Sequence, residues 1–238
     1  MLDIKVKIFK RSKHMELKGK IIDFLGDSIT EGAGVKDIKA CRYDNRIHER
    51  FELAAHYNYG IGGTRIAHQG VPSENPRYDL CFCGRAYNMN KSADVVVVYG
   101  GVNDYIHGDA YFGNMDDTTP ATFSGAVYFL MSKLRELYPD KAIVFMTPAH
   151  MHFCGHSDKF PSPRAIKKAD AKPLSAYVDV IKARGEQFGI PVLDLFEKLP
   201  INPNNEADKL KYTTDGLHFN DDGHAILANV LGDFLESL

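Results

Sequence analysis

Long hydrophobic runs are missing from this sequence. No stretch of apolar residues approaches the ~20 that a transmembrane helix needs. The opening segment, Met1 to Lys20, also lacks the apolar core of a secretory signal peptide. We therefore expect a soluble, cytoplasmic protein that makes no contact with a membrane.

Charge of one sign is also scarce. The formal net charge is -2, and no block of Lys or Arg dominates the chain. Nucleic-acid binding depends on clustered basic side chains that neutralise phosphates. The composition therefore gives no support for a nucleic-acid partner, and it leaves the charge of a small substrate open.

Cysteine is sparse. The four cysteines are Cys41, Cys81, Cys83 and Cys154, and their spacing matches neither a paired C-x-x-C metal site nor a disulfide framework. We expect free, mostly buried thiols. A chain of 238 residues with 44% hydrophobic side chains suits one globular domain that buries roughly 70% of its unfolded surface.

Sequence motifs of dinucleotide-binding proteins, of another serine-esterase family and of zinc enzymes are absent. G-I-G-G-T-R has Arg65 where the dinucleotide fingerprint needs a third glycine. G-D-S-I-T ends in Thr30, so the G-x-S-x-G elbow of another serine-esterase family is missing. No H-E-x-x-H motif occurs, which leaves a weak zinc alternative on His150, His152 and His156. We expect no cofactor and no bound metal.

Short apolar runs of strand length recur along the chain and alternate with helical patterns. The strands are expected at 21–25, 54–59, 94–99, 142–146 and 190–195, and the helices at 43–53, 78–90, 122–138, 173–188 and 221–238. Four consecutive valines in the third run leave no polar face, which is typical of a central parallel strand. The alternation predicts an α/β three-layer sandwich with about five parallel strands flanked by helices.

The chain is expected to form one domain over residues 21–238. Residues 1–20 form an N-terminal extension in which the alternating 2–8 segment predicts a possible edge strand and 11–20 a polar linker. The long loops 65–76, 105–120 and 150–172 carry no motif that identifies a substrate.

Ser28 stands just after the first predicted strand, in I-I-D-F-L-G-D-S-I-T, and ligands of open α/β sheets bind at the carboxyl ends of the strands. A serine hydroxyl is a poor nucleophile unless a base takes its proton and an acid orients the base. Asp215 and His218, three residues apart ahead of the last predicted helix, can fill both places. The carboxylate would bind Nδ1 and leave Nε2 free for Ser28.

Two further strand ends offer hydrogen-bond donors. Gly63 can present a backbone N–H without a side chain in the way, and Asn103 can offer its amide. With the N–H of Ser28, these donors could stabilise the oxyanion of an acyl transfer. Ordinary turn chemistry is the alternative explanation for both residues, and Gly62 is a near rival of Gly63.

Together these features resemble the SGNH, or GDSL, hydrolase family. The serine lies in G-D-S-I-T, the glycine in N-Y-G-I-G-G-T, the asparagine in G-G-V-N-D and the histidine in D-G-L-H, in the family's order. The resemblance implies a flavodoxin-like fold, a nucleophile at Ser28, a triad completed by Asp215 and His218, and an oxyanion hole made of Ser28, Gly63 and Asn103.

The sequence therefore predicts an ester hydrolase that forms an acyl-enzyme on Ser28 and acts on a small-molecule ester. The polar loops favour a short-acyl, acetyl-type substrate, with an acetylated carbohydrate as one candidate. Lipase, lysophospholipase or thioesterase activity of the same family stays an alternative. A non-enzymatic flavin- or phosphate-binding module is a rival that Asp27 and Glu31 disfavour, since their charges would repel an anion.

Contacts with the substrate are predicted for a further set of side chains: Asp27, Arg65, Asp104, His150 and His152. Four loop aromatics could also stack on sugar faces: Tyr111, Phe112, Phe153 and Phe160. The sequence carries no signal for the oligomeric state.

Overall fold

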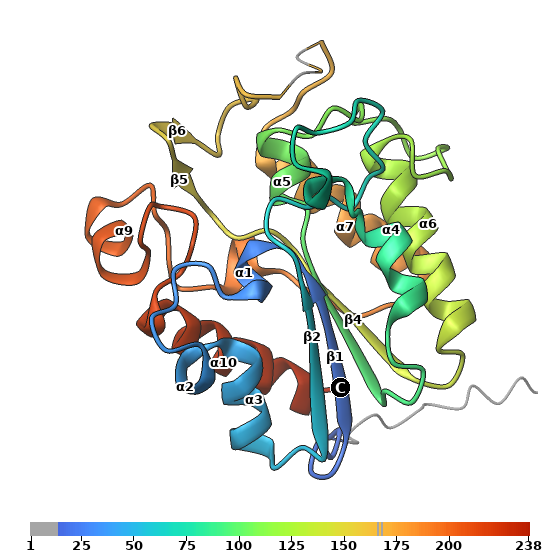
Figure 1. The fold of residues 1–238 in the computed structure, drawn as a ribbon, viewed down its shortest axis with the longest axis vertical. Helices are drawn as coiled ribbons and strands as arrows, with labels where there is room; N and C mark the ends of the chain where they lie inside the picture. The colour runs from blue at the N-terminus through green and yellow to red at the C-terminus, as the bar shows by residue number, and fades with distance from the viewer. Residues whose placement is uncertain (1–13, 166, 168) are drawn as a thin grey trace, which may run out of the picture.

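The computed structural model describes residues 14–165, 167 and 169–238. Figure 1 shows a central sheet between two layers of helices. The predicted α/β/α architecture is therefore confirmed. The possible edge strand at 2–8 lies outside the described residues.

The central sheet has five parallel strands in the order β2-β1-β3-β4-β7. The strands are β1 (Ile21–Gly26), β2 (Ala55–Gly60), β3 (Val95–Tyr99), β4 (Ala142–Met146) and β7 (Val192–Leu193). The chain leaves β1 toward β2 and then crosses back to β3 on its other side. This order is the flavodoxin-like one, which places its binding crevice between the carboxyl ends of β1 and β3.

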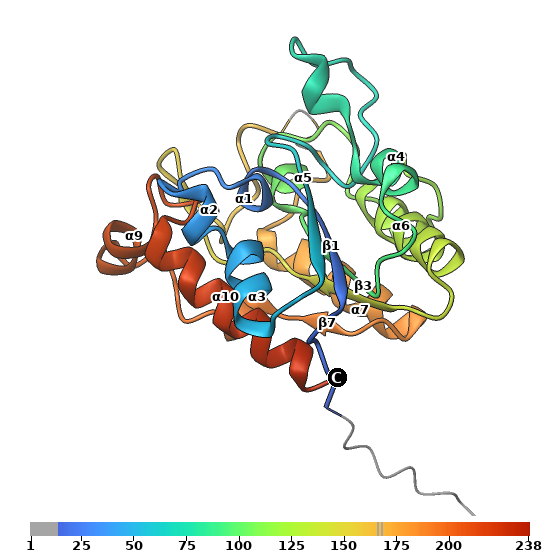
Figure 2. The ribbon, with the colours of Figure 1, turned by 60° about the horizontal axis from the view of Figure 1, so that its bottom comes forward.

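Both faces of the sheet are covered by amphipathic helices (Figures 1 and 2). One layer contains α2 (Ile38–Cys41), α3 (Tyr43–Phe51) and α10 (Asp221–Glu236), and the other contains α4 (Phe82–Arg85), α6 (Phe123–Leu137) and α7 (Leu174–Phe188). Every residue of β3 is buried. The four valines therefore lie in the middle of the core, as their lack of a polar face predicts.

The predicted helix over 78–90 is wrong. The segment consists of a 3-10 turn, η1 (Pro76–Asp79), the short helix α4 and a second turn, η2 (Ala86–Asn88). Leu80 and Cys81 leave the helical conformation between them, and the Phe82 N–H donates to the Arg65 carbonyl at 2.9 Å. A tertiary hydrogen bond thus overrides the local helical pattern.

Several short elements were not predicted. These are α1 (Ser28–Glu31), α5 (Val102–Ile106), α8 (Leu195–Lys198), α9 (Glu206–Tyr212) and the antiparallel pair β5 (His152–Phe153) and β6 (His156–Ser157). No residue of α9 is buried, so the polar 202–214 run has no hydrophobic period that could reveal a helix. The fifth strand is shorter than expected because the Asp194 side chain caps α8.

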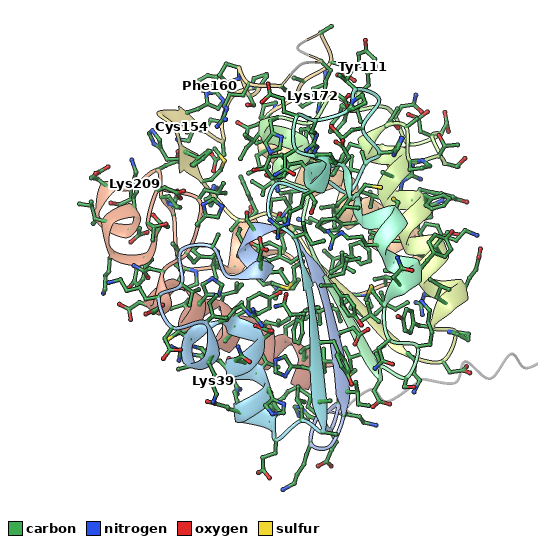
Figure 3. The ribbon with its side chains drawn as sticks, viewed as in Figure 1. Lys39, Tyr111, Cys154, Phe160, Lys172 and Lys209 are labelled. Atoms are coloured by element: carbon green, nitrogen blue, oxygen red, sulfur yellow. The ribbon has the colours of Figure 1, made fainter. Side chains whose placement is uncertain are left out.

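The described part of the N-terminal extension is attached to the core. Leu17 is buried, and the Met15 N–H donates to the Glu236 carbonyl at 3.1 Å. The four cysteines are free, but only Cys81 and Cys83 are buried, and Cys154 lies exposed in the β5–β6 turn (Figure 3). Among the described helices, none is long and apolar enough to cross a bilayer.

Candidate active site

Ser28 is held at the junction of β1 and α1. Strand β1 ends at Gly26, and the buried Asp27 caps α1 by accepting the Ile29 N–H at 3.0 Å. Burial raises the pKa of Asp27 to about 6. Helix α1 is capped at its C-terminus by Gly32, whose φ of 104° is the left-handed conformation that favours glycine. These two caps make a single helical turn that begins with the serine.

A chain of hydrogen bonds joins Ser28, His218 and Asp215. The Ser28 Oγ lies 2.9 Å from His218 Nε2, and His218 Nδ1 lies 2.7 Å from Asp215 Oδ2. The other Asp215 oxygen accepts the backbone N–H groups of Leu217 and His218 at 3.0 and 2.8 Å. This turn explains why a spacing of three residues aligns the carboxylate with the imidazole.

The state of Asp215 sets the tautomer of the histidine. Burial alone would raise the pKa of Asp215, but hydrogen bonds from the His218 side chain and backbone hold it below its ordinary value. An ionised carboxylate only accepts hydrogen bonds, so His218 Nδ1 donates and Nε2 is left to accept from the Ser28 hydroxyl. That is the orientation in which an imidazole can act as a general base.

Gly62 and Gly63 differ in whether their backbone N–H groups already donate a hydrogen bond. The Gly62 N–H donates to Glu31 Oε2 at 2.8 Å, while the Gly63 N–H has no partner in the described part of the chain. Gly63 has a φ of 75°, and a β-carbon there would collide with the Tyr78 ring. Gly63 is therefore the glycine with a free donor, at a position that strongly favours glycine.

A cavity of about 660 Å³ lies beside the Ser28–His218 pair, and Asp215 is outside its lining. Ser28, Gly63, Asn103 and His218 line it. Helices α1 and α5 directly follow β1 and β3, and Figure 1 shows α1 and α5 at the same end of the sheet. The remaining wall is mixed. Its charged side chains are Glu31, Arg65, Arg77, Asp109 and Arg164, and its apolar residues include Ala33, Val71, Pro72, Ile106, Phe153 and Leu217.

One of the five predicted substrate contacts, Arg65, lines this cavity. Its guanidinium donates to the Gly63 carbonyl at 3.0 Å and to the Tyr78 carbonyl at 3.2 Å. Asp27 and Asp104 are not among the lining residues. Asp104 is buried and accepts the N–H groups of Ile66 and Ala67 at 2.9 Å each, as a buried carboxylate must to offset its lost hydration. Both aspartates hold the backbone instead of facing the cavity.

His150 and His152 also lie outside the cavity lining. His150 Nδ1 lies 2.8 Å from Asp158 Oδ2, His152 lies in β5, and His156 stacks on Tyr105. Among the described residues, no three His, Cys, Asp or Glu side chains are grouped so that they could hold a metal ion. The three histidines of the zinc alternative therefore do not converge on one point.

The four loop aromatics separate into three environments. Phe153 lines the cavity, with its ring edge-on to His218 at 6.1 Å between centroids. Phe112 packs against Phe123 and Tyr177. Tyr111 and Phe160 are exposed and outside the cavity lining (Figure 3). Only Phe153 is placed to meet a ligand bound at Ser28.

Sequence reasoning missed several lining residues as members of the site. Arg77 forms an ion pair with Glu31 and reaches it from the loop after β2, where no motif marks it. Arg164 lies in another long loop. His107 had a usable signal, because it follows Asn103 by four residues and such pairs share a helix face.

Known proteins are similar to this chain in sequence and in fold. The GDSL-like lipase/acylhydrolase family matches residues 24–226 of the chain. No curated protein matches it. A solved structure of a protein from Lactobacillus plantarum is similar at 27% identity and a TM-score of 0.76, covering 92% of this chain and 98% of that one.

Two solved structures with named activities are also similar. The acetyl xylan esterase AlAXEase has 23% identity and a TM-score of 0.59, covering 90% of this chain and 98% of its own. An aryl esterase from M. smegmatis has 16% identity and a TM-score of 0.65, covering 92% and 99%. At these identities the likeness shows the fold. With the family match over most of its length, this chain belongs to the GDSL-like lipase/acylhydrolase family and is an ester hydrolase.

Proposed function

We propose that the protein hydrolyses carboxylic esters through an acyl-enzyme on Ser28 and that its substrates are small molecules with short acyl groups. The observation that carries the mechanism is the Ser28–His218–Asp215 hydrogen-bond chain, with 2.9 and 2.7 Å between the bonded atoms, at the wall of a cavity.

In the first half of the reaction, the Ser28 hydroxyl attacks the ester carbonyl carbon as His218 Nε2 takes its proton. Asp215 stabilises the imidazolium that forms. The tetrahedral intermediate collapses when the C–O bond to the alcohol breaks and His218 returns the proton to the leaving oxygen. In the second half, water attacks the acyl-enzyme with the same base, which releases the carboxylic acid and restores Ser28.

The oxyanion of each intermediate would be bound by the N–H groups of Ser28 and Gly63 and by the Asn103 amide. Asn103 Nδ2 donates one hydrogen to the Thr64 carbonyl at 3.0 Å, which leaves its second hydrogen for the substrate. Donors fixed before the reaction cost no reorganisation when the charge develops.

The short-acyl preference rests on the charged part of the cavity wall. A long alkyl chain in this cavity would lie against Arg65, Arg77 and Asp109 and remove water from their charges, which is unfavourable. A hydroxylated leaving group can accept and donate hydrogen bonds there, so an acetylated carbohydrate remains a candidate. The similarity to an acetyl xylan esterase is in keeping with this choice.

A longer acyl chain is the second candidate, as in a lipase, lysophospholipase or thioesterase. It is favoured by the apolar residues in the same wall, among them Val71, Ile106 and Leu217.

The mechanism is tested by covalent labelling with a sulfonyl fluoride or an organophosphorus ester. We expect mass spectrometry to find the label on Ser28 alone, and Ser28→Ala to lose both labelling and turnover. Ser73→Ala, which removes another hydroxyl from the cavity wall, serves as the control and should still be labelled. Label on another residue, or unchanged turnover in Ser28→Ala, would rule out the mechanism.

A further inference from the structure

His107 lies one residue beyond α5 and lines the cavity together with Asn103. Its Nε2 atom lies 3.0 Å from Asn103 Oδ1. Because α5 keeps the two residues four apart, the imidazole reaches the asparagine from the same side of the helix.

The hydrogen bonds of Asn103 determine which tautomer His107 adopts. The Thr64 carbonyl can only accept a hydrogen bond, so the Asn103 side-chain atom 3.0 Å from it must be the donor Nδ2. The other branch is Oδ1, which also only accepts. His107 must therefore donate through Nε2, and the hydrogen of a neutral imidazole is on that nitrogen.

The surroundings of His107 keep its imidazole uncharged. Burial lowers the pKa of His107 to about 4, and the nearby positive charges of Arg65, Arg164 and Lys167 act in the same direction. A neutral imidazole with its hydrogen on Nε2 offers no basic atom to Asn103, so it acts there as a hydrogen-bond donor.

We propose that His107 is a positioning residue of the oxyanion hole, which fixes the Asn103 amide so that its second Nδ2 hydrogen is directed into the cavity. The inference rests on the proposed roles of Ser28 and Asn103. The bond to Oδ1 also draws electron density from the amide, which makes the Nδ2 hydrogens stronger donors. Because the oxyanion exists only after attack on the carbonyl, the gain belongs to the transition state and should change kcat more than KM.

The first test removes the donor and keeps the ring. His107→Phe should lower kcat about 10-fold, less than the loss of a whole oxyanion-hole donor, with KM and Tm nearly unchanged. His107→Gln, which restores an N–H group, should recover most of the rate. The matched control is His68→Phe, because His68 is exposed and outside the cavity lining. A raised KM with unchanged kcat, or equal loss in the Phe and Gln variants, would overturn the proposal.

A double-mutant cycle separates positioning from an independent role. If His107 acts through Asn103, then Asn103→Ala with His107→Phe should have the same kcat as Asn103→Ala alone. Independent, multiplying losses would overturn the inference. Ser28→Ala distinguishes a failure of this inference from a failure of the proposed function. If Ser28→Ala is inactive while His107→Phe is fully active, only the role of His107 is ruled out. An active Ser28→Ala removes the proposed function and this inference together.

Discussion

Asp215, in the loop before α10, and Asp23, in β1, have opposite electrostatic environments. Asp215 receives hydrogen bonds from His218 that hold its pKa low. Asp23, in the middle of β1, is fully buried, and neither of its carboxyl oxygens makes a hydrogen bond of ordinary geometry within the described residues. Burial raises the pKa of Asp23 to about 7, although the nearby backbone N–H of Asn90 and the charge of Lys91 act against the rise. At the scale of single residues, hydrogen-bond donors decide whether a buried carboxyl group stays ionised.

Asp23→Asn should therefore stabilise the protein at alkaline pH. The folded chain keeps a proton on Asp23 between its unfolded value of 3.8 and its folded value of about 7, so the Asp23 contribution to stability is complete below the first value and is lost as pH rises through the second. We expect the variant to gain on the order of 4 kcal/mol in unfolding free energy at pH 8, because each of the roughly three pKa units is worth about 1.4 kcal/mol, and little at pH 4, measured by urea denaturation.

The control for that comparison is Asp116→Asn, because Asp116 is exposed. Its stability relative to the wild type should not change with pH. Equal destabilisation of Asp23→Asn at both pH values would instead show that the carboxyl group makes a necessary contact.

Asn103→Ala tests the proposed oxyanion hole. Its amide would bind the developing charge more strongly than the ground-state carbonyl, so we expect kcat to fall roughly 100-fold or more while KM changes little. Steady-state kinetics on an activated acetate ester give both values. An unchanged kcat with a raised KM would assign Asn103 to substrate binding.

At the scale of the elements, the loop between β2 and β3 is attached to α1 through one carboxylate. Glu31 forms an ion pair with Arg77 and accepts the Gly62 N–H through its other oxygen. The ion pair is partly exposed, with side-chain exposures of 45% for Arg77 and 38% for Glu31. Such pairs contribute about 0–1 kcal/mol to stability. The importance of Glu31 should therefore lie in the position of the 62–63 peptide.

This predicts unequal effects from the two partners. Glu31→Ala should lower kcat/KM about 10-fold, because it frees the Gly62 N–H and lets the neighbouring Gly63 donor move. Arg77→Ala should lower it less, since Glu31 can still hold Gly62. Thermal unfolding should show similar Tm values for both variants. A larger kinetic loss in Arg77→Ala would point to direct binding of the substrate by the guanidinium.

At the scale of the whole molecule, the mixed wall of the cavity sets the acyl preference. We expect kcat/KM for p-nitrophenyl esters to be highest for acetate and to fall toward octanoate, because longer chains would dehydrate the charged side chains around Ser28. Val71→Asp, at an apolar position of the wall, should steepen this decline. A rate that climbs steadily with chain length would favour a lipase or lysophospholipase.

The layers of the fold and the order of the site residues could be predicted from the amino-acid sequence alone. Buried strands and amphipathic helices have periods of their own, and the D-x-x-H spacing suffices because a short turn brings Asp215 and His218 together. Other features of the site depend on contacts between distant segments, which leave no local pattern in the sequence. In the folded chain the Gly62 N–H donates to Glu31, and the buried carboxylates of Asp27 and Asp104 accept backbone N–H groups. His150 pairs with Asp158 outside the cavity lining. The contact of His107 with Asn103 is the exception, because a spacing of four residues brings both side chains to one side of α5. The tertiary structure also placed Arg77 against Glu31, where charge pairing depends on a distance that only the folded chain fixes.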